Sequence, residues 1–267
     1  MIDGSKIVVA GNALVTGAGQ GVGREIALEL AAAGADVVVV NDYYRDRAEE
    51  VVEEIRASGK KARAAAFDVS SAGGVGEAMK ELAAHDISRF AVLVNNAGNA
   101  GPKAAGIGDT PFWQQTDQDW EKYLQTNLYG AMNCVRAVCK GMVDDGFGRV
   151  INIVSDAGRM GQANAEAYSA AKAGVAGFTR SFAASMGRYG VTANCISLAA
   201  MDTPGTPRIH EDAAAHERSK KILSRYVVRR YGLPSDVSGL AAFLASDRSS
   251  WITGQVIPVN GGYTFAL

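Results

Sequence analysis

The feature that most constrains this chain is an alternation of short apolar runs with longer amphipathic segments from end to end. Several of the short runs are uniformly apolar, which is typical of strands in a sheet covered on both faces. We predict strands at residues 12–17, 36–41, 61–67, 90–96, 149–155, 191–197 and 255–259. Their alternation with helices predicts an α/β fold, a doubly wound, seven-stranded and mostly parallel sheet with helices on both faces.

The segments between the strands have the periodicity of helices that pack on a sheet. Between residues 48 and 55, apolar side chains recur at i, i+3, i+4 and i+7, which is one face of a helix. Two longer helices are predicted at about residues 117–142 and 167–187. No linker or change of composition divides the chain, so we predict a single domain over residues 1–267.

Composition and charge limit the classes of partner. The net charge of −1 and the pI of about 6.3 leave no basic field for nucleic acids or anionic membranes. No run reaches the ~18 apolar residues of a membrane-spanning helix, and the first residues lack the apolar core of a signal peptide. Three cysteines in no metal-like spacing suit free thiols. We expect a cytoplasmic protein with a small-molecule partner and without nucleic acid, membrane or metal.

A glycine-rich stretch, TGAGQGVG at residues 16–23, joins the first predicted strand to a helix that begins near Arg24. Glycine lets the backbone approach a ligand, and free N–H groups at a helix start attract an anion. Asp42 follows at the end of the second strand, where a carboxylate accepts hydrogen bonds from a ribose. Together they predict a dinucleotide site, whereas the turn alone is also compatible with a tight strand-to-helix connection. Asp68, at the end of the third strand, is placed to reach the adenine side or to cap a helix.

The run AYSAAK places Tyr168 four residues before Lys172. Residues four apart are neighbours on a helix, so the ammonium group would favour the ionised phenol. A phenol has a pKa of about 10, and lowering it would produce an acid or base suited to catalysis. A solvated pair on a helix surface is the alternative.

The sequence resembles the short-chain dehydrogenase/reductase family over about residues 10–263. The resemblance rests on several motifs in the family's order, namely TGAGQGVG, NNAG at 95–98, LQTNLYG, INIVSDAG, YSAAK at 168–172 and ITGQVIPVNGGY. It implies a single Rossmann-type domain. It also implies catalytic roles for Asn127, Ser155, Tyr168 and Lys172.

The resemblance assigns a task to each of these four residues. Tyr168 would exchange a proton with the carbonyl or hydroxyl oxygen, and Ser155 would donate a second hydrogen bond to it. Lys172 would hold down the phenol pKa and bond the nicotinamide ribose, and Asn127 would anchor a water that relays protons. The implied cofactor contacts are Gly17, Gly19, Gln20, Gly21, Val22, Gly23, Asp42, Asp68, Val69, Asn96, Ala97, Gly98, Tyr168, Lys172 and Thr203.

The residues after the second strand bear on the choice between NAD and NADP. Gln20 gives the glycine turn no positive charge, and Asp42 would repel a 2′-phosphate. Asn41 occupies about the place where NAD-preferring relatives carry their acid, and Arg45 and Arg47 follow closely. We expect NAD, with NADP possible if an arginine reaches the ribose.

Two features depart from the family pattern or exceed it. Leu198 and Ala199 stand where the family commonly has Pro-Gly after its sixth strand, which leaves the geometry beside the nicotinamide open. The segments at about 99–116 and 199–230 are predicted substrate loops, and the second resembles the family's substrate lid.

The sequence therefore indicates an oxidoreductase that transfers hydride between NAD(H) and a secondary alcohol or ketone. An alternative is a reductase of 3-oxoacyl thioesters on carrier protein or coenzyme A, because SDAGR and the closing motif resemble such enzymes. A remote alternative is a non-catalytic nucleotide-sensing protein. The two long helices resemble those with which the family packs subunits, so we expect a homotetramer, with a dimer as the alternative.

Overall fold

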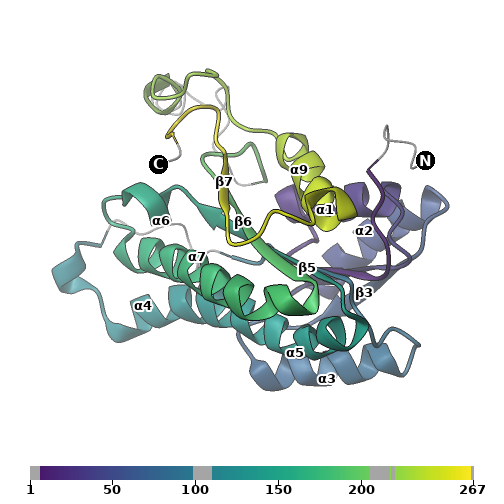
Figure 1. Cartoon of the computed structure of the whole chain (residues 1–267). Coiled ribbons are helices and arrows are strands. Elements are labelled where there is room, and N and C mark those ends of the chain that lie inside the picture. Colours follow the sequence, from purple (N-terminus) through teal and green to yellow (C-terminus); the bar gives the residue numbers. More distant parts are fainter. Residues whose placement is uncertain (1–6, 99–109, 205–216, 218–219, 266–267) are drawn as a thin grey trace.

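The computed structural model describes residues 7–98, 110–204, 217 and 220–265. These residues form one seven-stranded sheet in the order β3-β2-β1-β4-β5-β6-β7 (Figure 1). Its strands are β1 (Ala13–Val15), β2 (Val38–Asp42), β3 (Ala62–Ala66), β4 (Val92–Asn95), β5 (Gly148–Ser155), β6 (Val191–Leu198) and β7 (Val256–Val259). The predicted fold class is confirmed, and the sheet is fully parallel because every strand pair is parallel.

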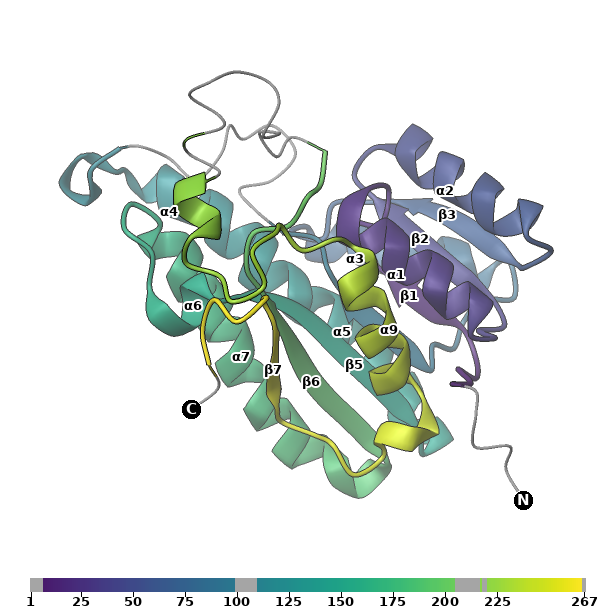
Figure 2. The same ribbon diagram turned by 90° about the horizontal axis from the view of Figure 1, so that it is seen from above.

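Helices cover both faces of the sheet, as predicted (Figures 1 and 2). One face is packed by α1 (Gly21–Ala32), α2 (Arg45–Ala57) and α9 (Ser235–Ala245). The other is packed by α3 (Ala72–Ala83), α5 (Gly130–Asp145) and α7 (Glu166–Met186). Shorter elements are α4 (Asp117–Leu124), α6 (Ala157–Met160), η1 (Phe112–Gln114), η3 (Gly187–Tyr189) and η4 (Asp247–Ser249).

The register of the central strands explains why their sequences are uniformly apolar. Leu14 is opposite both Val39 and Leu93, and these three side chains form one row beneath α3 and α5. Their neighbours Val15 and Val40 point to the other face, toward α1 and α2. Because both faces are buried, the ligand-accessible edge is at the carboxyl ends of the strands.

The predicted helix over residues 117–142 is interrupted by a π-helical turn. α4 begins with a capping box between Thr116 and Asp119, and the turn η2 (Gln125–Tyr129) follows it before α5 starts. Such turns insert one extra residue into a helix and re-aim its side chains. Asn127 lies within this turn, so its direction is set by an irregularity that the apolar periodicity did not reveal.

Candidate active site

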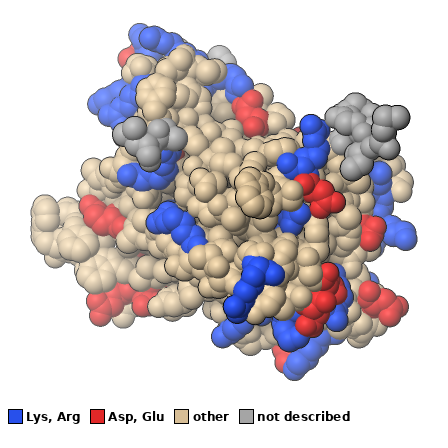
Figure 3. Space-filling view, viewed as in Figure 1, with Lys and Arg blue, Asp and Glu red and all other residues tan. Residues whose placement is uncertain are grey.

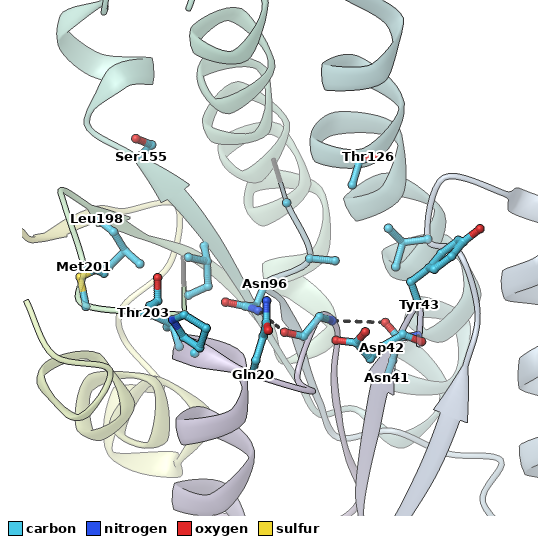
Figure 4. A pocket seen from close by; sticks show the side chains of 18 of the residues that line it. Gln20, Asn41, Asp42, Tyr43, Asn96, Thr126, Ser155, Leu198, Met201 and Thr203 are labelled. Carbon is cyan, nitrogen blue, oxygen red and sulfur yellow. Dashed lines mark hydrogen bonds between the residues drawn. The ribbon is translucent and has the colours of Figure 1, made fainter. Parts of the chain in front are cut away.

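A cavity of about 480 Å³ opens along the carboxyl ends of the strands (Figure 4). In this view Asn41 and Asp42 lie on one side of Gln20 and Asn96, and Leu198, Met201 and Thr203 lie on the other. The predicted residues that line the cavity are Gly17, Gln20, Gly21, Val22, Asp42, Asp68, Val69, Asn96, Ala97, Gly98, Ser155, Tyr168, Lys172 and Thr203. They are spread along the chain from Gly17 to Thr203, and the sheet brings them to one edge.

Three predicted site residues stand behind the cavity wall. Gly19 donates its backbone N–H to Asp42 Oδ2 at 3.1 Å. A Cβ at Gly23 would lie 2.3 Å from Asn96 Nδ2 and 2.4 Å from the Gly17 carbonyl oxygen, so only glycine fits there. Asn127 is buried and donates Nδ2 to the Tyr123 carbonyl at 2.9 Å.

The glycine turn is held in place by the fourth strand. Asn96 Nδ2 donates to the carbonyls of Thr16 at 3.0 Å and Gly17 at 2.8 Å, and the Thr16 hydroxyl accepts the N–H groups of Asn96 and Ala97. α1 then begins without a side-chain cap, because Gln20 makes no capping hydrogen bond. Such a helix start is suited to an anionic group such as a pyrophosphate.

Asp42 is a buried acid at one end of the cavity, which we call the nucleotide end because the ribose site is predicted there. Its Oδ2 accepts from Gly19 N and its Oδ1 accepts from Tyr44 N at 3.0 Å. Neighbouring Asn41 is also buried and donates to the carbonyls of Ala65 and Phe67. Asn41 thus joins β2 to the end of β3, and Asp42 presents the carboxylate to the cavity.

The two arginines that follow differ in position. Arg45 is exposed and pairs with Glu49 at 3.5 Å. Arg47 lines the cavity, and its guanidinium lies 4.7 Å from the ring centroid of Tyr44. Arg47 is therefore both exposed and next to the predicted ribose site, whereas Arg45 does not line the cavity.

Asp68 lines the cavity but does not cap the following helix. Its Oδ1 accepts from both the N–H and the hydroxyl of Ser70, at 2.8 and 2.7 Å. The cap of α3 is Ser71, whose hydroxyl accepts from Gly74 N at 3.0 Å. Asp68 is therefore held in a hydrogen-bonded turn with Ser70, at the adenine side of the predicted site.

Ser155, Tyr168 and Lys172 meet at the other end of the cavity. Ser155 ends β5, and the other two lie one turn apart on α7. The Lys172 ammonium donates to the Ile153 carbonyl at 3.0 Å and lies 5.9 Å from the centroid of the Tyr168 ring. A Cβ at Gly98 would be 3.0 Å from Asn127 Oδ1 and 3.1 Å from Lys172 Nζ, so both polar groups face this glycine.

The pKa shifts in this group differ from our prediction. Burial raises the pKa of Tyr168, and a hydrogen bond with Ser155 opposes that rise. The predicted lowering of the Tyr168 pKa by Lys172 is therefore not found. Burial lowers the pKa of Lys172 itself to about 8, while the Cys195 thiol beneath it acts in the opposite direction. Lys172 is thus a buried ammonium group whose pKa lies below that of an exposed lysine.

The segment that replaces Pro-Gly forms part of the cavity wall. Leu198 and Ala199 both line it, and the Leu198 carbonyl accepts the N–H of Asp156 at 2.9 Å. Thr203 lies close to the glycine turn, since a Cβ at Gly21 would be 3.3 Å from its Cγ2. The predicted substrate loops include residues 99–109, 205–216 and 218–219, which lie outside the described residues.

Several residues that line the cavity were not predicted from the sequence. Tyr43 and Tyr44 follow Asp42 and line the nucleotide end, and Thr126 and Met201 line the middle and the far end. The two tyrosines in NDYYRDR could have been predicted as cavity residues, because they directly follow the predicted ribose-binding acid. Thr126 and Met201 carried no signal, because their places depend on the π turn and on the path of the chain after β6.

The cavity suits a dinucleotide by its volume, its uncapped helix start and a buried carboxylate at one end. In the described part of the chain, no helix is long and apolar enough to span a membrane. Within the same residues, no group of three His, Cys, Asp or Glu side chains could hold a metal ion.

Comparison with known proteins agrees with this geometry. A family model described as "Enoyl-(Acyl carrier protein) reductase" matches residues 17–264. The 3-oxoacyl-[acyl-carrier-protein] reductase of Staphylococcus epidermidis is 37% identical over 254 residues, which cover 94% of this chain and 98% of that protein. The reductase of the same name from Synechocystis is 40% identical over 251 residues, 94% of this chain and 95% of its own.

A solved structure is similar along the whole fold. A gluconate 5-dehydrogenase from Burkholderia cenocepacia, in complex with NADP and tartrate, has a TM-score of 0.83 and 32% identity over 96% of both chains. The ordered motifs, the parallel sheet and these relatives have one explanation. The chain belongs to the short-chain dehydrogenase/reductase family of NAD(P)-dependent oxidoreductases that act on CH–OH groups.

Proposed function

We propose that this protein interconverts a secondary alcohol and a ketone at the end of the cavity where Ser155, Tyr168 and Lys172 meet. The observation that carries the proposal is the convergence of these side chains in one cavity with Asp42 at its opposite end. Bound NAD(P)H would supply the hydride. The residues of the chain would bind the cofactor, orient the carbonyl and move the proton.

In the reductive direction, negative charge develops on the carbonyl oxygen. The Tyr168 hydroxyl would give its proton to that oxygen, and the Ser155 hydroxyl would donate a second hydrogen bond. In oxidation Tyr168 would act as the base, so the Ser155 hydrogen bond that favours its ionised form is useful in that direction. Lys172 would bond the nicotinamide ribose, and Asn127 would hold a relay water.

The first substrate class to test is the 3-oxoacyl thioester, on coenzyme A or a carrier protein. Two relatives that match nearly the whole chain bear the name 3-oxoacyl-[acyl-carrier-protein] reductase. Simple ketones and secondary alcohols form the second class, with support from the gluconate 5-dehydrogenase of similar structure.

NAD is the cofactor we propose, with NADP as the alternative. Asp42 is fixed by two backbone N–H groups, and its charge would repel a 2′-phosphate while accepting from ribose hydroxyls. The alternative is favoured by Arg47, which lines the same end of the cavity. The similar structure from Burkholderia cenocepacia holds NADP.

The decisive variant is Tyr168→Phe, which removes only the hydroxyl. We expect kcat to fall by roughly 10² to 10⁴-fold, with cofactor affinity nearly unchanged, because one acid/base group is lost. Tyr189→Phe removes a phenol that does not line the cavity and serves as the control. Activity of Tyr168→Phe within threefold of wild type would refute the proposed role. Failure of the wild type to turn over any alcohol, ketone or thioester would favour the nucleotide-sensing alternative.

We further propose a homotetramer, or failing that a dimer, in the cytoplasm. Tyr129 and Met132 are exposed apolar side chains on η2 and α5, the long helical segment that the family uses for assembly.

The three cysteines are unpaired thiols. In Figure 3, most of the face is uncharged, and basic and acidic side chains are scattered over it, which offers no broad site for nucleic acid. A light-scattering mass near 27.9 kDa would refute assembly, and fractionation with a cytoplasmic marker tests location.

A further inference from the structure

Asp156, the residue after Ser155, is a buried carboxylate for which the reaction has no evident use. Only 2% of it is exposed, although it lies at the edge of the site. A buried carboxylate is costly unless several donors satisfy it. Its partners therefore indicate what it stabilises.

Those partners come from two distant parts of the chain and from α6, which directly follows Asp156. The Ser197 hydroxyl donates to Oδ1 at 2.6 Å, Asn260 Nδ2 donates to Oδ2 at 2.6 Å, and the Thr264 hydroxyl donates to Oδ2 at 3.1 Å. Arg159, on α6, adds an ion pair at 3.3 Å. The carboxylate thus joins the end of β6, α6 and the segment after β7.

Arg159 strengthens the connection to the C-terminal segment. Its guanidinium donates to the Thr264 hydroxyl and to the Phe265 carbonyl, both at 3.2 Å. Figures 1 and 2 both show this end of the chain beside α6. The segment at residues 260–265 is therefore held against Asp156 and α6, directly after Ser155 at the end of β5.

The same segment also supports the cavity wall after β6. Tyr263 stacks on Tyr226 with ring centroids 5.0 Å apart, and the Tyr226 hydroxyl accepts the Ala200 N–H at 2.9 Å. On the inner side, the Asp156 N–H donates to the Leu198 carbonyl. The Leu198-Ala199 wall, which lacks the family's Pro-Gly, is thus fixed from two sides.

We infer that Asp156 is a positioning residue, which uses the C-terminal segment to hold the Ser155 hydroxyl toward Tyr168 and the Leu198-Ala199 wall against the cofactor site. This inference rests on the proposed roles of Ser155 and Tyr168. Asp156 acts through its neighbours and does not itself touch the reacting atoms. Its loss should therefore affect turnover more than cofactor binding.

The test compares Asp156→Asn with the milder pair Thr264→Val and Thr264→Ser. Asp156→Asn should lower kcat roughly 10 to 100-fold, the scale of losing an outer-shell partner, with the cofactor Kd changed by less than about threefold. Thr264→Val should lower kcat by roughly threefold, and Thr264→Ser, which retains the hydroxyl, should remain within about twofold of wild type.

The pH profile separates positioning from stability alone. The Ser155 hydrogen bond opposes the rise in the Tyr168 pKa, so its loss should raise that pKa further. Alcohol oxidation needs the ionised phenol, and its profile should therefore move to higher pH in Asp156→Asn and Thr264→Val but not in Thr264→Ser. Tm is measured for each variant, so that losses from unfolding are recognised.

An unchanged pH profile in folded Asp156→Asn would overturn the inference, whatever the change in kcat. If Asp156→Asn does not fold, an unchanged profile in Thr264→Val overturns it. Tyr168→Phe is assayed in parallel. If that variant is active, the proposed function fails; if it is inactive while Asp156→Asn behaves as wild type, only the positioning role fails.

Discussion

The two ends of the cavity differ in the chemical groups that line them and in the solvent exposure of those groups. At the nucleotide end the chain offers backbone N–H groups, one fixed carboxylate and side chains that remain in solvent, such as Tyr43, which is 46% exposed, and Tyr44, which is 38% exposed. At the catalytic end, where Ser155, Tyr168 and Lys172 meet, Lys172 is 6% exposed and nearby Asn127 is 2% exposed, while Ser155 and Tyr168 are half-buried.

This difference has an energetic consequence. A charge in solvent interacts weakly with its neighbours, whereas a buried one is strongly coupled to them and costly to place. We therefore expect changes at the catalytic end to have large effects on both rate and stability. Changes in the exposed side chains of the nucleotide end should adjust cofactor preference by smaller factors.

Besides Tyr168→Phe, the largest effect is expected for Lys172→Met, which keeps the length of the side chain and removes its charge. Turnover should fall by at least about 10²-fold, and cofactor affinity should fall as well if the lysine reaches the ribose. Unchanged cofactor affinity would show that it does not. Lys60→Met, at an exposed lysine, controls for the loss of a surface charge.

The same variant should be more stable than wild type at neutral pH. Burial lowers the pKa of Lys172 from 10.5 to about 8, so the unfolded chain binds the proton more tightly. At 1.36 kcal/mol per pH unit this costs the wild type roughly 3 kcal/mol below pH 8, a penalty that disappears as the pH rises from 8 to 10.5. Denaturant unfolding at pH 7 and pH 10 measures the difference between variant and wild type. A difference that does not shrink at high pH would contradict this account.

Gly23→Ala tests whether backbone packing at the nucleotide end is as demanding as burial at the catalytic end. The added Cβ would clash with Asn96 and the Gly17 carbonyl, so we expect a loss of about 1–3 kcal/mol in stability. Weaker cofactor binding, by roughly tenfold, should accompany the shifted turn. Gly76→Ala in α3, where a Cβ meets nothing within 4 Å, is the matched control and should stabilise the protein by roughly 0.4–1 kcal/mol. Equal stability and equal cofactor affinity of the two variants would contradict the proposal that backbone packing at Gly23 is demanding.

Asp42→Ala should shift the ratio of kcat/KM for NAD over NADP by at least roughly tenfold toward NADP. The loss of a charged hydrogen-bond acceptor is worth about 1.5–3 kcal/mol, and the repulsion of the 2′-phosphate is lost with it. Both cofactors are compared with one substrate. A wild-type preference for NADP, or a ratio that does not move, would indicate that Arg47 governs this end.

The smallest effect is expected for Arg47→Ala. Because this guanidinium is exposed, we expect it to contribute at most about 1 kcal/mol, and kcat/KM for NADP should fall by up to roughly fivefold. Arg45→Ala, at the arginine that pairs with Glu49, should leave both cofactors unaffected. An effect of Arg47→Ala as large as that of Lys172→Met would contradict the expected difference between exposed groups at the nucleotide end and buried groups at the catalytic end.

The sequence predicted the fold well because the fold is a matter of periodicity. Uniformly apolar strands, the helical stripe near residue 50 and the glycine turn are local patterns, and their order along the chain determines a parallel sheet. The long helix was predicted as continuous, and the π turn around Asn127 was missed, because one inserted residue hardly disturbs an apolar pattern.

The sequence by itself also determined that Tyr168 and Lys172 are neighbours on any helix that contains them, and it predicted them on that ground as residues of the proposed chemistry. Only the tertiary structure decided the direction of the Tyr168 pKa, because burial depends on segments that the sequence does not place. It alone brought Asp156 to Asn260, 104 residues away, and turned Arg47 but not Arg45 toward the cavity. Local spacing determines which groups are neighbours along a helix or strand, whereas solvent exclusion and long-range hydrogen bonds are set by how those elements pack.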